Sequence, residues 1–303
     1  MADKDKIEKT LEAYNDVFAD IVNVLLFNGN TKVKEEDLED ESPISIFKAD
    51  GKIHSQERDV AKFWKNSNVR IALYGFENQT KKDRDMPFRI IAYDGASYKR
   101  QLIDDKKTSK NRSKKVHYPV ITLVLYFGEQ HWKKPRSLVE ALNIDDDLKP
   151  FVSDYKINIF EIAYLSDEQL NMFTSDFKIV ADYFVQKRKN KNYIPSKQVI
   201  KHVEEVMELM RVLTGDKDYE ITEKLIYMKG EPITMDTWLH DTLEKERIDA
   251  KNKGKIEGKL EALYSLMKKG VLSLQQVAVE MGLSIAKLKK ELDKHSMDYS
   301  EFI

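Results

Sequence analysis

The sequence predicts a mixed α/β fold, in which a mixed sheet core is flanked by helices and followed by a helical C-terminal extension. Two extended segments, Asp59–Trp64 and Val69–Gln79, are joined by four residues that include turn-forming Asn and Ser. A continuous apolar run rich in β-branched residues, Pro119–Phe127, is typical of a strand buried on both faces. From Ser166 onward the pattern is almost wholly helical.

The N-terminal part is predicted to begin with a helix over Lys6–Phe27, because its apolar residues recur at steps of three and four. The turn-forming residues Asn28-Gly29-Asn30 end this helix. An acidic, irregular stretch follows and leads into a short apolar run, Ile44–Phe47, which the turn residues Ala49-Asp50-Gly51 close.

The remaining elements are predicted in the same way. A helix is expected at about Phe88–Ile103 and one more strand at Ile157–Leu165. Further helices are expected near residues 167–190, 196–213, 235–269 and 273–293. The chain then divides into a sheet-containing core at 1–165, a helical region packed on it at 166–235, and C-terminal helices at 236–303.

Composition narrows the class of protein. The 303-residue chain is 41% hydrophobic and 34% charged, and no apolar run approaches the length that crosses a bilayer. Its first residues lack the features of a secretory or transit peptide, so we expect a cytoplasmic protein with no membrane contact. The absence of cysteine excludes disulfides and thiolate chemistry, and the six histidines show no zinc-binding spacing.

A candidate site is formed by Asp59, Glu77 and Gln79. Glu77 and Gln79 lie two residues apart at the end of one predicted strand, so their side chains share a face. A hairpin would bring Asp59, at the start of the other strand, beside them. Two carboxylates and an amide suit Mg²⁺ or Mn²⁺, which prefer oxygen ligands. Carboxylates at strand ends are also common in proteins without such a site, so the pattern alone leaves both interpretations open.

The residues around this site resemble a known family. The stretch Glu57–Leu102 contains Asp59 before an apolar strand, then Gly-Phe-Glu-Asn-Gln at a strand end, Met-Pro-Phe-Arg, and a helix with Tyr-Asp and Tyr-Lys-Arg-Gln-Leu. It is similar to the core of the recombination-promoting nuclease and putative transposase family, within the PD-(D/E)XK nucleases. The similarity extends to residues 14–18 and 118–128 and covers about half of the chain.

The resemblance implies a restriction-endonuclease-like core in which Asp59 and Glu77 are metal ligands and catalytic residues together with Gln79. Gln79 takes the place usually held by lysine and lacks its positive charge, although an amide still hydrogen-bonds water or phosphate. In this fold an acid from the first helix can reach the metal, which makes Asp16 a third candidate ligand. A solvated helix carboxylate explains Asp16 equally well, and Asp20 lies one turn later.

Two segments are candidates for binding DNA. Residues 106–115 contain six cationic side chains and no acid. Such a pattern attracts phosphate but also occurs in solvated loops. Lys81, Lys82 and Arg84 directly follow the candidate site in the sequence. Ala278, Gly282 and Leu288 have the spacing of a helix-turn-helix, which a plain helical hairpin also satisfies. The cations assigned to DNA contact are Lys81, Lys82, Lys106, Lys107, Lys110, Arg112, Lys114 and Lys115.

Three functions remain in competition. The first is a divalent-metal-dependent DNA endonuclease that hydrolyses phosphodiester bonds, as the family resemblance implies. The second is a DNA-binding protein that keeps the nuclease fold without cutting. The third is an interaction scaffold that forms homo-oligomers through its charged C-terminal helices.

Overall fold

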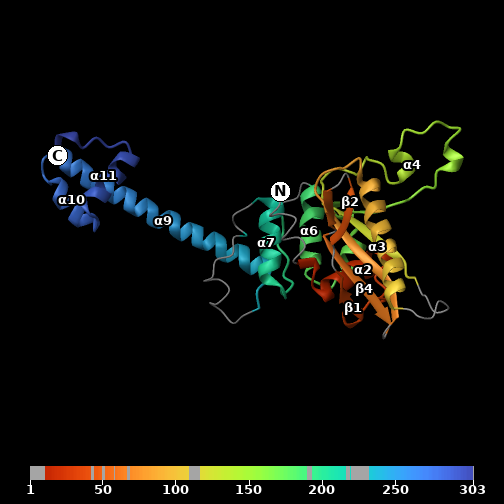
Figure 1. Cartoon of the computed structure of the whole chain (residues 1–303). Helices are drawn as coiled ribbons and strands as arrows, with labels where there is room; N and C mark the ends of the chain where they lie inside the picture. The colour runs from red at the N-terminus through yellow and green to blue at the C-terminus, as the bar shows by residue number, and fades with distance from the viewer. Residues whose placement is uncertain are drawn as a thin grey trace. The chain divides into compact units, whose positions relative to one another are not determined.

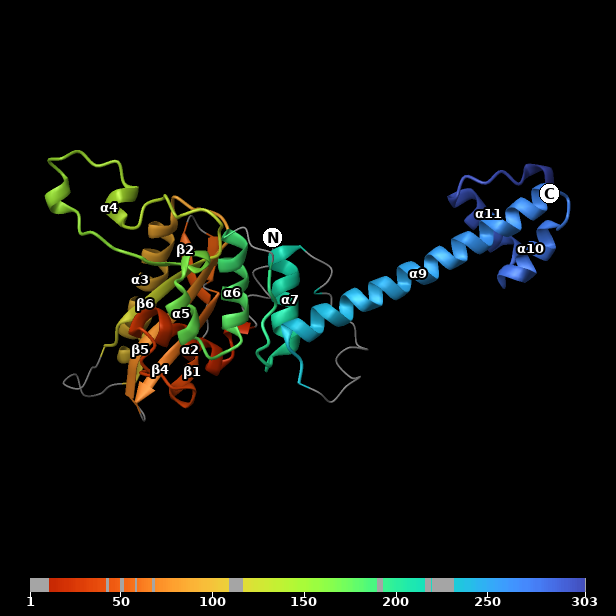
Figure 2. The ribbon, with the colours of Figure 1, turned by 180° about the vertical axis from the view of Figure 1, so that it is seen from behind.

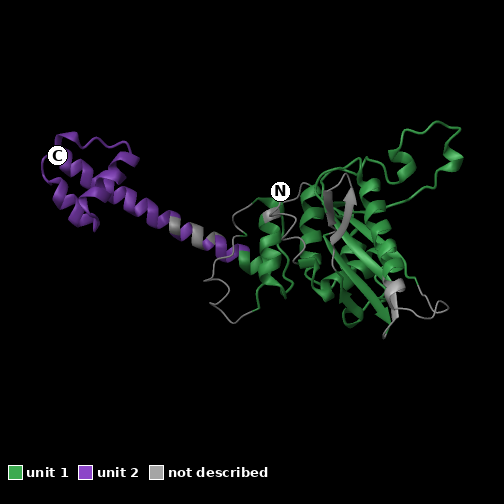
Figure 3. Cartoon of the chain, viewed as in Figure 1, with its two compact units in different colours: residues 1–238 green, residues 239–303 purple. Residues whose placement is uncertain are grey.

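A computed structural model describes residues 11–41, 44–49, 52–57, 59–66, 69–108, 117–189, 193–215, 219 and 232–302. The chain divides into two compact units, residues 1–238 and residues 239–303 (Figure 3). Residues 166–235, which the sequence pattern separates from the core, fall within the first unit.

The first unit is built on a five-stranded mixed sheet within the described residues, with strand order β1-β4-β5-β6-β7 (Figures 1 and 2). The pairs β1–β4 and β4–β5 are antiparallel, whereas β5–β6 and β6–β7 are parallel. The predicted mixed α/β architecture is therefore confirmed. The strands are β1 (Leu38–Asp40), β4 (Val60–Asn66), β5 (Val69–Gln79), β6 (Val120–Tyr126) and β7 (Asn158–Glu161).

Helices cover both faces of this sheet. Phe76 of β5 stacks on Phe18 of α2 (Asn15–Phe27), with ring centroids 4.2 Å apart, so α2 lies on the Phe76 face. On the same face, Phe127, just beyond β6, packs against α6 (Phe177–Arg188). On the other face, α3 (Met86–Thr108) buries Met86, Ile90 and Tyr93 against Val124 of β6. Glu77 follows Phe76 along the strand, so its side chain points toward α3.

The predicted apolar strand after the basic segment is confirmed as β6, which is almost wholly buried. Its neighbour β5 begins and ends where the sequence predicts. An excursion of the chain between β6 and β7 contains the short helix α4 (Leu138–Ala141) and stands out from the sheet (Figure 1). The predicted strand over Ile157–Leu165 is shorter, because a 3₁₀ helix takes over at Ile162–Tyr164.

The strands β3 (Lys52–Glu57) and β1 were not predicted. The apolar run Ile44–Phe47 belongs to β2 (Ile44–Ala49), which pairs with β3 in a separate two-stranded hairpin. The sequence of β3 has no clear apolar alternation. The acidic stretch was expected to be irregular, yet β1 forms there by pairing with β4. Lys62 explains part of this pairing, because its buried ammonium group makes an ion pair with Asp40.

The predicted first helix is interrupted within the described residues. Leu11 and Glu12 are helical, but Tyr14 is extended, and α2 starts only at Asn15. The Tyr14 ring stacks on His202 with centroids 3.7 Å apart, and its hydroxyl donates to Glu205 over 2.7 Å. A contact with a distant part of the chain thus replaces the local helical geometry.

The helical region also differs from the prediction in detail. Residues 167–190 form two helices, α5 (Asp167–Met172) and α6, because Thr174 and Ser175 between them bind the carboxylate of Asp20. The helix expected from residue 196 is α7 (Val203–Thr214). It starts later than predicted, and in the segment before it Ile200 donates its N–H to the Ile233 carbonyl over 2.8 Å.

The second unit contains most of α9 (Met235–Lys268), α10 (Leu274–Met281) and α11 (Ile285–Lys294). The predicted turn at Gly282 is confirmed, and its φ of 67° is in the left-handed region that glycine adopts most readily. These helices share a buried cluster: Leu260, Met267, Leu274, Val277, Ala278, Leu288 and Leu292. Of the helices in the described part of the chain, none combines the length and apolar character needed to cross a membrane.

Candidate functional site

The candidate site lies where β5 ends and β4 begins. The two strands are antiparallel and pair Val60 with Phe76, so Asp59 arrives beside the end of β5. The Asp59 N–H donates to the Phe76 carbonyl over 3.1 Å, and one Asp59 carboxylate oxygen accepts the N–H of Asn78 over 2.5 Å. The structure therefore brings Asp59 next to Glu77, as the hairpin prediction expected.

Glu77 and Gln79 share the face of β5 that α3 covers. The Gln79 amide nitrogen donates to Glu77 Oε1 over 3.1 Å. Only 2% of the Glu77 side chain is exposed, so its carboxylate is held inside the protein rather than in water. Removing a carboxylate from water is costly unless charged or polar groups compensate for it.

Arg89 provides that compensation. It lies in the first turn of α3, and its guanidinium makes an ion pair with Glu77 and a second one with Asp83 at 3.2 Å. Burial acts to lower the pKa of Arg89, but the negative charge of Glu77 and the contacts with Tyr93 and Asp83 together raise it overall. This arginine ends the Met-Pro-Phe-Arg motif, and no role for it was predicted from the sequence.

Tyr93 lies one helical turn after Arg89, and its pKa depends on the charges of the same site. Its hydroxyl is 3.4 Å from the Arg89 guanidinium. Burial raises the pKa of Tyr93, the negative charges of Glu77 and Asp59 add to the rise, and Arg89 works against it. The strand pairing places Asp59 opposite Glu77 at the end of β5, in agreement with these contributions.

The opposite face of the same strand end contains an acid that was not predicted from the sequence. The Asn78 side chain donates to Glu12 over 2.8 Å, and Glu12 is 1% exposed. Glu12 comes from the helical residues before the break at Tyr14. The signal that could have found it is its place beside Leu11, on the apolar stripe of the predicted helix, where a charged residue must have buried partners.

Asp16 lies elsewhere. Its carboxylate accepts from Lys201 over 2.7 Å and from His202 over 3.2 Å, in the segment that leads into α7. Burial opposes ionisation of Asp16, but the hydrogen bonds from Lys201 and His202 prevail and lower its pKa. These contacts do not bring Asp16 to Asp59 and Glu77, so its role as a third ligand stays a prediction that they do not support.

The cations assigned to DNA contact are described only in part. Lys81 is exposed beside the end of β5, and Lys82 donates to Gln130 over 2.9 Å, which ties the segment after β5 to the segment after β6. Lys106 and Lys107 lie in the last turn of α3. Lys110, Arg112, Lys114 and Lys115 lie outside the described residues.

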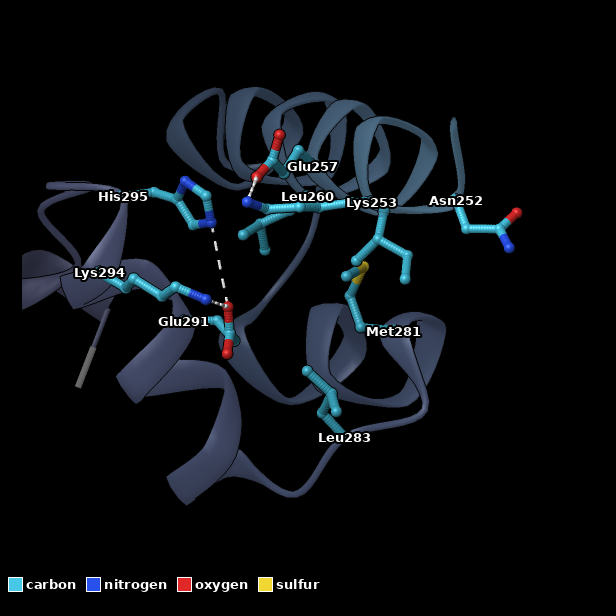
Figure 4. Close-up of a pocket in the computed structure, with 10 residues that line it drawn as sticks. Asn252, Lys253, Glu257, Leu260, Met281, Leu283, Glu291, Lys294 and His295 are labelled. Carbon is cyan, nitrogen blue, oxygen red and sulfur yellow. Dashed lines mark ion pairs between the residues drawn. The ribbon is translucent and has the colours of Figure 1, made fainter. Parts of the chain in front are cut away.

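The C-terminal hairpin forms the second candidate element. Ser273 and Ser284 cap α10 and α11 by accepting backbone N–H groups. A pocket of about 500 Å³ lies beside the buried cluster that α9 shares with the hairpin, and is lined by apolar side chains such as Leu260 and Met281 and by charged ones such as Glu257 and Glu291 (Figure 4). The hairpin is as predicted, whereas DNA binding by it stays a prediction.

Among the described residues, no group of three or more histidine or acidic side chains is arranged to hold a metal ion. The strand-end site instead offers two carboxylates, a side-chain amide and a guanidinium, on a mixed α/β scaffold.

Comparison with known proteins shows the family to which the chain belongs. Residues 65–219, just over half of the chain, match the family model described as Putative transposase, YhgA-like. The chain therefore belongs to this family of YhgA-like putative transposases. The matched segment includes Glu77, Gln79 and Arg89, whereas Asp59 precedes it. No curated protein and no solved structure gave a significant match.

Proposed function

We propose that this protein is a divalent-metal-dependent DNA endonuclease with a PD-(D/E)XK-like core, and that Asp59, Glu77 and Gln79 form its catalytic site. The observation that carries the proposal is the position of Asp59 on the backbone of Asn78, directly beside Glu77 at the end of a central strand. The family match adds support, because transposases act on DNA.

The donor set fits Mg²⁺ or Mn²⁺. Magnesium is commonly bound by one or two carboxylates, with water and substrate phosphate completing its octahedral shell. Asp59 and Glu77 would hold such an ion, and a third protein carboxylate is not required. When bound, the ion would polarise the scissile phosphate and lower the pKa of an attacking water.

The protein groups would prepare this site in three ways. The N–H of Asn78 orients the Asp59 carboxylate at the strand end. Arg89 and Gln79 both donate to Glu77 Oε1 and fix its rotamer. The Gln79 amide oxygen would accept a hydrogen bond from the attacking water and orient it. Such preorganisation lowers the reorganisation needed during reaction.

DNA would reach this site along the cations that follow β5. Lys81 and Lys82 would contact the phosphate backbone, and Lys106, Lys107, Lys110, Arg112, Lys114 and Lys115 would extend the contact beyond α3. Phosphate contacts are independent of base sequence, so these cations would position the DNA without selecting a target sequence.

A second candidate function is DNA binding without cleavage. The observation that favours it is Gln79 itself, because an amide brings no positive charge to the transition state. Under this alternative the lysines still bind phosphate, but the strand-end carboxylates serve only to fold the sheet.

The test is a plasmid assay with purified protein. Supercoiled DNA is incubated with Mg²⁺ or Mn²⁺ and the wild-type protein, Asp59→Asn or Glu77→Gln, and each protein is compared with the same reaction in EDTA. Metal-dependent nicking that both substitutions remove is the expected result. Binding of the plasmid without nicking by all three proteins would contradict the proposal and favour the alternative. Asp146→Asn, which changes an exposed carboxylate paired with Lys149, is the matched control.

A further inference from the structure

The Arg89 side chain contacts a buried acid and is also partly exposed to solvent. Its guanidinium contacts Glu77, which is 2% exposed, yet 38% of the Arg89 side chain remains exposed. It also pairs with Asp83, whose side chain is 29% exposed, so the guanidinium reaches from a buried acid toward solvent. The arrangement fixes a cation at the boundary between the strand-end site and solvent.

The guanidinium also has donors to spare. Its contacts are Nη1–H to Asp83, and Nη2–H to Glu77 and to the Tyr93 hydroxyl. These use three of the five N–H groups that a guanidinium carries, so further N–H groups are available to an acceptor. The side chain is held in place from the inside, which reduces the entropy that binding such an acceptor would cost.

Charge defines the acceptor. Asp59, Glu77 and Asp83 surround this region, and a polyanion cannot approach three carboxylates without cations between them. Arg89 pairs with two of these carboxylates, and exposed Lys81 and Arg84 lie close by in the chain. A guanidinium matches the oxygens of a phosphate in geometry and is more weakly hydrated than an ammonium group.

We propose that Arg89 contacts a phosphate oxygen of DNA at the strand-end site and there supplies the positive charge that Gln79 lacks. This inference rests on the proposed function, because it takes the site to be where DNA is bound. Arg89 would thus have two roles on its two sides: it positions Glu77 through one N–H group and binds phosphate through others.

The rival explanation is that Arg89 only neutralises Glu77. The two explanations differ in the salt dependence of DNA binding, because removing one phosphate-binding cation reduces the slope of log affinity against log salt concentration by about 0.9. A counter-ion inside the protein contributes nothing to this slope.

The experiment measures binding of a short fluorescein-labelled DNA duplex by anisotropy, in EDTA and across a series of potassium chloride concentrations. Arg89→Met is expected to reduce the slope by about 0.9 and to weaken binding severalfold, whereas Arg89→Lys should keep the slope. Arg100→Met is the matched control, because Arg100 lies on the same helix and also pairs with a carboxylate, that of Glu41. It should leave the slope unchanged.

A possible failure of Arg89→Met to fold is addressed by a second pair. Glu77→Gln removes the buried charge, so Glu77→Gln with Arg89→Met is compared with Glu77→Gln alone, and the same reduction in slope is expected. An unchanged slope in both comparisons would overturn the inference even if the protein cuts DNA, and failure of the wild-type protein to bind DNA would overturn it as well. A reduced slope supports it even if the protein never cuts, so this result is separate from the plasmid assay.

Discussion

Two acidic centres in the first unit have similar composition. In one, Glu77 pairs with Arg89; in the other, Asp16 accepts from Lys201 and His202. Each joins different elements of the fold, and each places a carboxylate beside a cation. Charge pairing alone therefore does not separate a functional site from a structural contact.

The two centres differ in the groups that lie next to Glu77 and Asp16. Glu77 has a second carboxylate beside it, Asp59, which the backbone N–H of Asn78 orients at the end of a central strand. Asp16 lies between two basic side chains, and Tyr14 stacks on the same histidine, so this centre fastens the start of α2 to the start of α7. A metal site needs neighbouring acids, and of these two centres the first places two carboxylates side by side.

The largest expected effect concerns metal affinity. Asp59→Asn and Glu77→Gln each remove a proposed ligand, so titration of Mn²⁺ followed by calorimetry should show a loss of roughly 100-fold or more, about 2.7 kcal/mol. Asp16→Asn should leave the affinity unchanged. If Asp16→Asn weakened Mn²⁺ binding as strongly as Glu77→Gln, the distinction between the two centres would be wrong.

The next effect, on the stability of the fold, is expected on the opposite face of β5. Asn78→Ala removes the donor to buried Glu12, and a hydrogen bond to a charged group contributes about 1.5–3 kcal/mol. Urea denaturation should show a loss of stability in this range with an unchanged slope of the transition. Full stability in Asn78→Ala would indicate that Glu12 is compensated by other groups.

The next effect concerns DNA affinity. Lys81→Gln and Lys82→Gln should each reduce the slope of log affinity against log salt concentration by about 0.9, because each removes one phosphate contact. Lys201→Gln, which belongs to the second centre, is the control and should not change the slope. Equal slopes for the wild-type protein and all three variants would remove Lys81 and Lys82 from the DNA-binding surface.

The smallest effect is on stability at the second centre. The pKa of Asp16 in the folded protein lies below its ordinary value of 3.8, so ionised Asp16 stabilises the fold above that pH, and the contribution is lost as the pH falls through the folded pKa. Asp16→Asn should cost less than about 1 kcal/mol at neutral pH and nothing in strong acid. Thermal denaturation across this range measures it, with Asp146→Asn as the exposed control. A penalty that persists in strong acid would contradict the ion-pair account.

Much of the fold could be predicted from local pattern. The bounds of β5 and the burial of β6 follow from apolar, β-branched runs that have few alternative structures. The strand β1 could not be predicted, because it forms only by pairing with β4 and has an acidic sequence of its own. The break at Tyr14 was hidden for a similar reason, since the histidine that its ring stacks on lies far away in the chain.

In the candidate site, the residues on the strands could be predicted, whereas those contributed by helices could not. Hairpin geometry brings Asp59, Glu77 and Gln79 together from sequence spacing alone. Glu12 and Arg89 approach the same strand end from helices, so their positions depend on helix packing that no spacing rule supplies. Asp16 was named from the same predicted helix and Glu12 was not considered, but the helix is broken between the two residues and they reach different parts of the fold.

The central claim is tested most directly by plasmid nicking with Glu77→Gln and Asp16→Asn side by side, in Mn²⁺ and in EDTA. We expect Asp16→Asn to nick DNA at the wild-type rate, whereas Glu77→Gln should lose roughly 100-fold or more of the rate because a metal ligand contributes several kcal/mol to the transition state. Nicking by Glu77→Gln at the wild-type rate, or nicking that persists in EDTA, would contradict the account.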